Sequence, residues 1–105
     1  MNTPEFEKVV KDQFEFCFNL LFEKSKQYSI GTPDRLHAFK VAAEFQGITN
    51  KQALLGMLTK HLVSLSDMIG SDDDYSEDVW NEKISDAINY LLLLKATVIE
   101  DLNNK

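Results

Sequence analysis

The C-terminal part of the chain is so apolar that we expect other helices to pack against it. Residues 80–100 carry apolar side chains at helical spacing for most of their length. Early in this stretch Glu82, Asp86 and Asn89 are four and three residues apart, which places them on one stripe of a helix. The stripe continues to Leu93, so its polar groups lead toward residues that other helices must cover. The stretch therefore predicts a long helix with carboxylates at the edge of a core.

Helical periodicity and helix-start signals recur along the rest of the chain. Thr-Pro pairs at 3–4 and 32–33 are typical first turns, and Thr49 with Gln52 fits a capping box. The loop after the third segment offers Asp74 or Ser76 as the next cap. The predicted helices span residues 4–28, 33–46, 50–69 and 77–102. Because the connections are short and 105 residues suffice for one domain, we expect an all-α, four-helix bundle-like single domain.

Composition excludes several kinds of partner. The net charge is −6 and Arg35 is the only arginine, so a broad basic face for duplex nucleic acid is not expected. No signal peptide is recognised, and the longest apolar run is too short to span a bilayer. These features predict a cytoplasmic protein with no membrane partner. The lone cysteine, Cys17, lies in an apolar run and is interpreted as a small buried hydrophobe.

The first predicted helix has an unusually wide apolar face. Phe18 and Phe22 add aromatic side chains beside the main stripe, which includes Val10, Phe14 and Cys17. These side chains cover more of the helix circumference than the neighbours in a small bundle would need. The sequence therefore predicts assembly into a homodimer or homotetramer.

The stripe in the last helix suggests a metal site. Glu82 and Asp86 are like-charged at a spacing of four, which adds repulsion rather than support to a helix. Their carboxylates and the Asn89 amide oxygen are hard ligands of the kind that Mg²⁺ or Mn²⁺ prefers. The alternative interpretation is a solvated flank, with Glu82 near the helix N-terminus to match the dipole.

Other candidate residues lie on the earlier helices. Lys60, Ser64 and Asp67 form a polar stripe on the third helix, next to His61. In an antiparallel bundle this stripe can face the fourth helix. The side chain of Lys60 or His61 would then meet an anionic ligand or offset the charge of Glu82. The alternative is a packed, hydrogen-bonded His61. Lys24 and Tyr28 form a further candidate pair, for which the alternative is a solvated C-terminal turn.

Together these residues form a pattern that resembles a known group. The pattern comprises Lys24-x-x-x-Tyr28, Lys60-His61 with Asp67, and Glu82-Lys-Ile-Ser-Asp86-x-x-Asn89-Tyr90-Leu. It resembles small helical proteins of bacteriophages and prophages, which are grouped with nucleotide-modification-associated domains and MazG-like all-α nucleotide pyrophosphatases. The resemblance covers residues 16–100. It implies a four-helix core, oligomerisation and acidic residues that hold Mg²⁺ against a nucleoside triphosphate, with Glu82 and Asp86 as the acidic pair on the later metal-binding helix.

The expected function follows from this resemblance. Glu82 and Asp86 would hold Mg²⁺ or Mn²⁺, Asp67 would complete the metal shell or orient water, and Lys60 or Lys24 would contact phosphate. Tyr28, His61 and Asn89 are further ligand-binding candidates. The Glu-x-x-Glu motif typical of an earlier helix in MazG-like enzymes has no counterpart here. The expectation is therefore nucleotide binding, with pyrophosphohydrolysis left open. The alternative is a non-enzymatic helical interaction or regulatory protein of phage origin without a metal site.

Overall fold

Helices account for most of the described chain. A computed structural model describes the backbone of residues 1–28 and 31–105, and the side chains of residues 1–23 and 31–105. In this part the chain forms α1 (Thr3–Tyr28), α2 (His37–Gln46), α3 (Asn50–Gly70) and α4 (Glu77–Asn103), and it contains no strand. The prediction of an all-α helical bundle is confirmed.

Local hydrogen bonds set the start of α3 and of α4. The Thr49 hydroxyl accepts from the Gln52 backbone N–H, and the Gln52 side chain accepts from the Thr49 N–H, so the predicted capping box is present. At α4 the Ser76 hydroxyl accepts from the Val79 N–H at 3.3 Å. Each cap satisfies backbone donors that have no partner inside their own helix.

The start of α2 differs from the sequence-based expectation. Residue 33 was the expected start, but α2 begins at His37. The Thr32 hydroxyl accepts from the Asp34 N–H at 3.1 Å, and the Asp34 carboxylate accepts from the Leu36 N–H at 3.0 Å. These short-range bonds hold a turn in place of a first helical turn. Thr32-Pro33-Asp34 is therefore a turn that precedes the helix.

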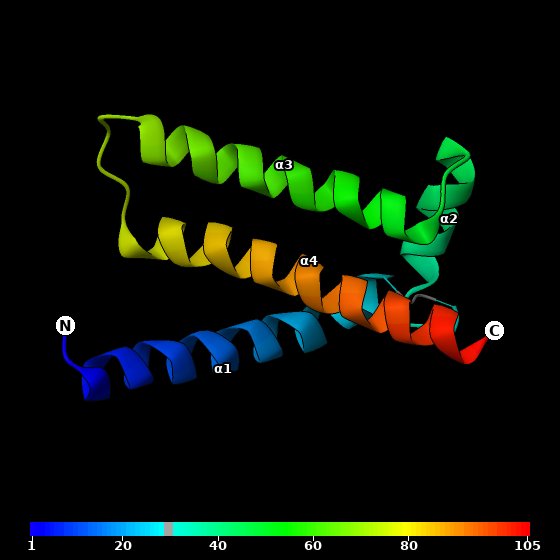
Figure 1. Ribbon diagram of the computed structural model, residues 1–105, viewed down its shortest axis with the longest axis horizontal. Coiled ribbons are helices and arrows are strands. Elements are labelled where there is room, and N and C mark those ends of the chain that lie inside the picture. Colours follow the sequence, from blue (N-terminus) through cyan, green and yellow to red (C-terminus); the bar gives the residue numbers. More distant parts are fainter. Residues whose placement is uncertain (29–30) are drawn as a thin grey trace.

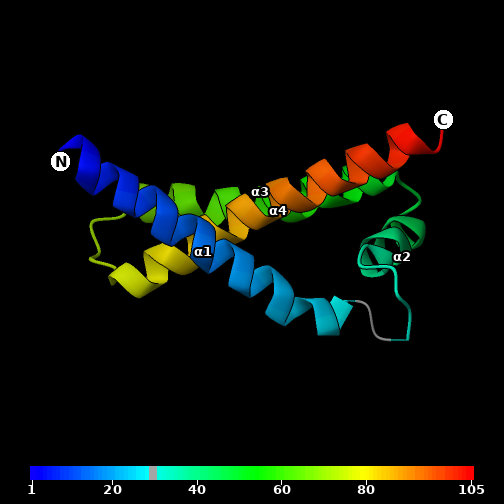
Figure 2. The ribbon, with the colours of Figure 1, turned by 90° about the horizontal axis from the view of Figure 1, so that it is seen from below.

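The central helix of the fold is α4. Figure 1 shows α3 and α4 antiparallel and side by side, with α1 on the other side of α4, and Figure 2 shows α1 crossing the pair at an angle. The short α2 packs mainly on α3, near the C-terminal end of α4. A buried apolar cluster lies where α2, α3 and α4 meet, and its members are Leu36, Phe39, Leu54 and Leu93.

This arrangement is more extended than a typical domain of its length. The radius of gyration is 15.8 Å, and the molecule measures 45 × 29 × 26 Å. A compact domain of about 100 residues has a radius of gyration of about 13 Å. The layers are therefore thin, and many apolar side chains on α1, α3 and α4 stay at the surface.

The long helices are amphipathic. Helices α1 and α4 contain 26 and 27 residues, but charged side chains recur along both. In the part of the chain that the structure describes, no helix combines the length and the apolarity needed to cross a membrane.

Candidate functional site

A row of polar side chains enters the protein along α4. Glu82 is exposed, Asp86 is 9% exposed and Asn89 is 6% exposed. Leu93, one turn further on the same stripe, belongs to the apolar core cluster. The predicted stripe therefore runs from solvent at Glu82 to the core at Leu93. Buried polar side chains are unusual in a small helical domain. This row is therefore the first candidate for a site.

The middle of this row faces α3. The Nδ1 atom of His61 lies 3.8 Å from the Oδ2 atom of Asp86, a distance that forms an ion pair when His61 is protonated. The His61 ring stacks on Tyr90, with ring centroids 5.0 Å apart and an interplanar angle of 26°. Tyr90 in turn forms a T-shaped pair with Phe39 from α2, with ring centroids 6.4 Å apart. His61 is thus a packed residue, as one interpretation had it, and the carboxylate that it faces is that of Asp86 rather than that of Glu82.

Asn89 carries the least satisfied polar atom of the row. Its Oδ1 atom is buried and has no hydrogen-bond partner among the described residues. An amide oxygen buried in this way destabilises a fold by about 1–3 kcal/mol. Buried polar atoms of native proteins are nearly always paired, and exceptions are found where a ligand, ion or water binds.

The candidate residues of α3 and α4 lie on the same side of the helix pair. The His61–Tyr90 stack marks the contact between the two helices, and each residue turns a helix by about 100°. Lys60 and Asn89 each precede a member of this stack. Because α3 and α4 are antiparallel (Figure 1), the residue before His61 and the residue before Tyr90 lie on the same side of the helix pair. We call this the polar side. Its members are Lys60, Ser64 and Asp67 on α3, and Glu82, Asp86 and Asn89 on α4.

The predicted metal ligands stay dispersed along the polar side. Glu82 and Asp67 are exposed, whereas Asp86 is buried. Among the described residues, no three His, Cys, Asp or Glu side chains come together as a group that could hold a metal ion. The chain therefore offers two carboxylates at helical spacing and one amide oxygen, without a third acid beside them.

The structure describes the side chain of Lys60 but not those of the ligand-binding candidates on α1. Lys60 is exposed at the polar side and able to reach a ligand. The side chains of Lys24 and Tyr28 lie outside the described residues. Their role stays a prediction, although both residues belong to the last two turns of α1.

Sequence reasoning missed a buried polar contact between α1 and α4. The Gln13 Nε2 atom donates to the Ser85 Oγ atom at 2.7 Å and lies 3.1 Å from the Cys17 sulfur. Ser85 is completely buried, and Cys17 is buried as predicted. Gln13 lies between Val10 and Cys17 on the apolar stripe of α1. A polar residue at a core position was the available signal, and it predicts a partner on a neighbouring helix.

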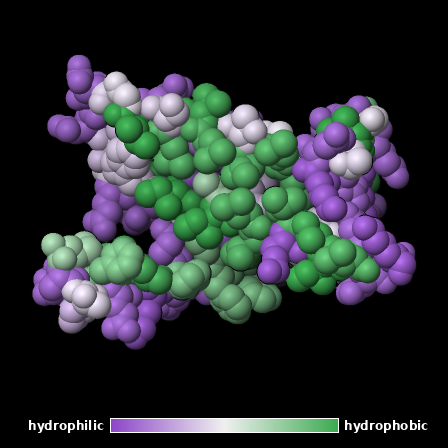
Figure 3. Space-filling view, in the orientation of Figure 1, coloured by the Kyte–Doolittle hydropathy of each residue, from purple (hydrophilic) through white to green (hydrophobic). Residues whose placement is uncertain are grey.

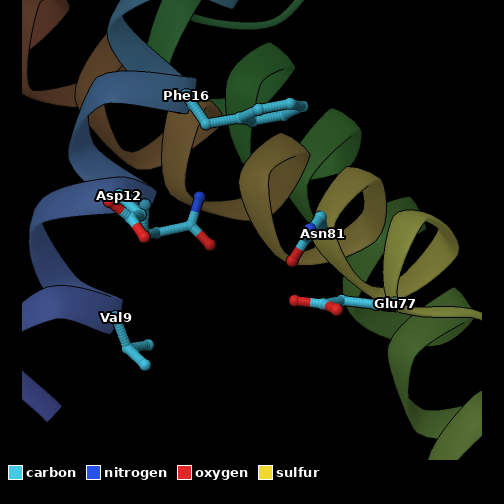
Figure 4. A pocket seen from close by; sticks show the side chains of 6 residues that line it. Val9, Asp12, Phe16, Glu77 and Asn81 are labelled. Carbon is cyan, nitrogen blue, oxygen red and sulfur yellow. The ribbon is translucent and has the colours of Figure 1, made fainter. Parts of the chain in front are cut away.

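A cavity of about 260 Å³ lies between the first half of α1 and the start of α4. Figure 4 shows Glu77 and Asn81 of α4 pointing toward Asp12 of α1. The lining residues are Val9, Asp12, Gln13, Phe16, Glu77 and Asn81. Asp12 already pairs with Lys8, and both of the cavity's carboxylates belong to exposed residues. The cavity is therefore a solvated cleft with no chemical feature comparable to Asn89.

A second, more open groove runs between the end of α1 and the second half of α4. Its volume is about 540 Å³, and its lining residues are Phe18, Leu21, Phe22, Arg35, Leu92, Leu93 and Ala96. Arg35 donates to the Leu21 carbonyl at 3.4 Å, which ties the turn before α2 to α1. The aromatic excess predicted for the first helix thus forms one wall of an apolar groove.

Comparisons of the chain with protein-family models, curated proteins and solved structures found no match. The residues of the polar side are therefore the main indication of function.

Proposed function

We propose that the chain binds a phosphate-bearing nucleotide through Mg²⁺ or Mn²⁺ on the polar side of α3 and α4. The observation that carries this proposal is the Asn89 Oδ1 atom, which is buried, has no hydrogen-bond partner among the described residues and lies one turn from the buried carboxylate of Asp86. An oxygen of this kind accepts a hydrogen bond or coordinates a cation once a ligand enters. Asp86 and Asn89 together supply oxygen ligands for a cation and one negative charge, and both residues are buried.

The donor set suits a cation that is shared with phosphate. Glu82 and Asp86 are one helical turn apart, so their carboxylates can reach one ion. Proteins often hold Mg²⁺ through one or two carboxylates, with phosphate oxygens and waters as the other ligands. A third acid is therefore unnecessary when the ligand carries phosphate. Such a bridging cation also explains how a chain of net charge −6 binds an anion.

Residues of α3 complete the proposed site. Lys60 lies on the polar side and is exposed, so its ammonium group can pair with phosphate oxygens. Asp67 is six residues after His61, and Glu82 is four residues before Asp86. At about 1.5 Å per residue these offsets place Asp67 and Glu82 at similar levels of the antiparallel pair. Asp67 is then suited to accept a hydrogen bond from a metal-bound water.

The proposal is for binding, with turnover as a separate question. Pyrophosphate release needs an attacking water held in line with the bond that breaks. The MazG-like enzymes that this sequence resembles use a Glu-x-x-Glu motif on an earlier helix, and the chain has none. Nucleotide binding needs only the polar side.

Thermal unfolding with ligand tests this proposal. Mn²⁺ alone and Mn²⁺ with each nucleoside triphosphate are added while the Tm is followed. A ligand at 100 times its Kd stabilises the native state by about 2.7 kcal/mol, and each kcal/mol raises the Tm of a domain of this size by about 4–8 °C. We expect the largest shift with nucleotide and Mn²⁺ together. Pyrophosphate release, measured on the same samples, reports turnover independently.

Two matched variants locate the response. Asp86→Asn removes the buried carboxylate, and we expect it to abolish the nucleotide-dependent shift. Asp73→Asn removes an equal charge from the exposed loop before α4 and should leave the shift intact. The proposal fails when no triphosphate shifts the Tm of the natural chain, or when Asp86→Asn responds as fully as Asp73→Asn.

A second candidate function is favoured by the apolar surface of α3 and α4. Large hydrophobic side chains remain exposed on both helices, and Figure 3 shows them gathered over the face in view. A non-enzymatic helical interaction protein would use such a surface and would show no response to nucleotides. The Tm experiment therefore distinguishes the two candidate functions.

A further inference from the structure

The side of the α3/α4 pair opposite the polar side is apolar and uncovered. Leu62 follows His61, and Leu91 follows Tyr90, so both lie about 100° beyond the stacked rings. Because the helices are antiparallel, both leucines turn toward the same side, away from Lys60 and Asn89. Leu62 is 49% exposed and Leu91 is 52% exposed. We call this the apolar side.

The apolar side extends along both helices. Leu55, Leu62 and Ile69 are seven residues apart on α3, and all three are exposed. On α4, Ile84 and Leu91 repeat the same interval and are exposed as well. A spacing of seven keeps side chains on one stripe and is the repeat by which helices pack together in coiled coils. Figure 3 shows the hydrophobic face that these two helices present.

Charge distinguishes the apolar side of α3 and α4 from the exposed phenylalanines of α1. The chain has 17 acidic residues, but α3 contains a single one, Asp67, which lies on the polar side. Two copies of an acidic protein can therefore meet along α3 with little like-charge repulsion. On α1, by contrast, the exposed phenylalanines alternate with charged residues, including Lys11 and Glu15.

The exposed area matches what a stable dimer buries. A compact monomer of 12.0 kDa has an accessible surface of about 6,000 Å². The surface of this chain is 7693 Å², an excess of about 1,700 Å². Permanent homodimers bury about 1,000–2,500 Å² on each subunit. The excess of one chain therefore lies within the range of area that one subunit of a permanent dimer buries.

We infer that two copies of the chain associate through the apolar side of α3 and α4, each covering the Leu62–Leu91 surface of the other. The contact is isologous, because the same surface is used by both copies. Two antiparallel helix pairs stacked in this way form an intermolecular four-helix bundle. The polar sides then face outward on opposite faces of the dimer, away from the contact between the two copies.

Light scattering after size-exclusion chromatography tests this inference. We expect the natural chain to elute with twice its mass of 12.0 kDa. Leu91→Glu places a carboxylate at the centre of the apolar interface and should raise the dimer dissociation constant by at least about 100-fold. Because Leu91 is half-exposed in the single chain, circular dichroism of the variant should retain the helical signal.

A neighbouring leucine provides the matched control. Leu92 is the next residue of α4, is also partly exposed, and lines the groove beside α1 on a different side of the helix. Leu92→Glu makes the same chemical change about 100° away, and we expect it to remain dimeric. A monomeric natural chain would overturn the inference. So would a Leu92→Glu variant that dissociates while a folded Leu91→Glu variant stays dimeric.

Discussion

His61 on α3 lies 3.8 Å from Asp86 on α4 through its Nδ1 atom, while its ring stacks on Tyr90. The His61 side chain therefore takes part in the packing between α3 and α4 and also lies at the edge of their polar side. The carboxylate that the proposed cation needs is held where α3 and α4 touch. Changes to the packing of α3 against α4 should therefore also change ligand binding.

Replacing Asn89 separates stability from binding. Asn89→Leu substitutes an apolar side chain of similar size for a buried amide whose oxygen has no partner in the described chain. We expect the free energy of unfolding to rise by about 1 kcal/mol, because the desolvated oxygen is removed. The nucleotide-dependent rise in Tm should be lost in the same variant. Urea unfolding and the thermal assay measure the two effects.

Thr97→Val is the control for this prediction. Thr97 is also buried on α4, but its hydroxyl already donates to the Leu93 carbonyl at 3.0 Å. Its replacement should not raise stability as Asn89→Leu does, and the nucleotide response should persist. An Asn89→Leu variant less stable than the natural chain would show that the amide is fully satisfied in solution.

Replacing His61 tests whether its ring or its charge matters to the fold. His61→Phe keeps a planar ring against Tyr90, whereas His61→Ala removes the stack. Aromatic pairs add about 0.5–1.5 kcal/mol beyond the area that they bury. We therefore expect His61→Ala to lower the free energy of unfolding by at least about 1 kcal/mol more than His61→Phe. Equal losses in urea unfolding would mean that the contact with Asp86 is the important one.

A network around Lys40 should make stability depend on pH. The Lys40 ammonium group donates to the Asp34 carboxylate at 2.7 Å and also pairs with Glu100 of α4. The hydrogen bond from Lys40, with a second from the Leu36 N–H, holds the pKa of Asp34 below its ordinary value of 3.8. The ionised form of Asp34 is therefore favoured by folding. Its contribution is fully present above about pH 4 and is lost as the pH falls through the lowered pKa.

Asp34→Asn measures this contribution. At pH 7 we expect the variant to be less stable than the natural chain by at most about 1 kcal/mol, because the pair is one-third exposed and screened by water. At a pH well below 4 the gap should shrink, since the natural carboxylate is then protonated as well. Urea unfolding at both pH values gives the comparison. A gap that is independent of pH would exclude this role of Asp34.

Several local features of the fold were accessible from the sequence because they depend on near neighbours. Thr49 and Gln52 form the expected capping box, and Ser76 caps α4. Asp34 shows where this reasoning fails, since its carboxylate binds the Leu36 N–H and Lys40, so the helix begins at His37. The same Thr-Pro signal can therefore precede either a helix or a turn, because side-chain bonds to nearby backbone groups compete with a first helical turn.

The amino-acid sequence by itself determined that Glu82, Asp86 and Asn89 share a stripe, because helical period depends only on spacing. Tertiary structure decided that Glu82 stays in water while Asn89 is buried, with an oxygen that no described residue partners. It also decided that His61 meets Asp86 and that Leu62 and Leu91 share an uncovered side. Burial depends on which distant segments pack against a stripe. A repeat of 3.6 residues shows that a face exists and leaves open what covers it.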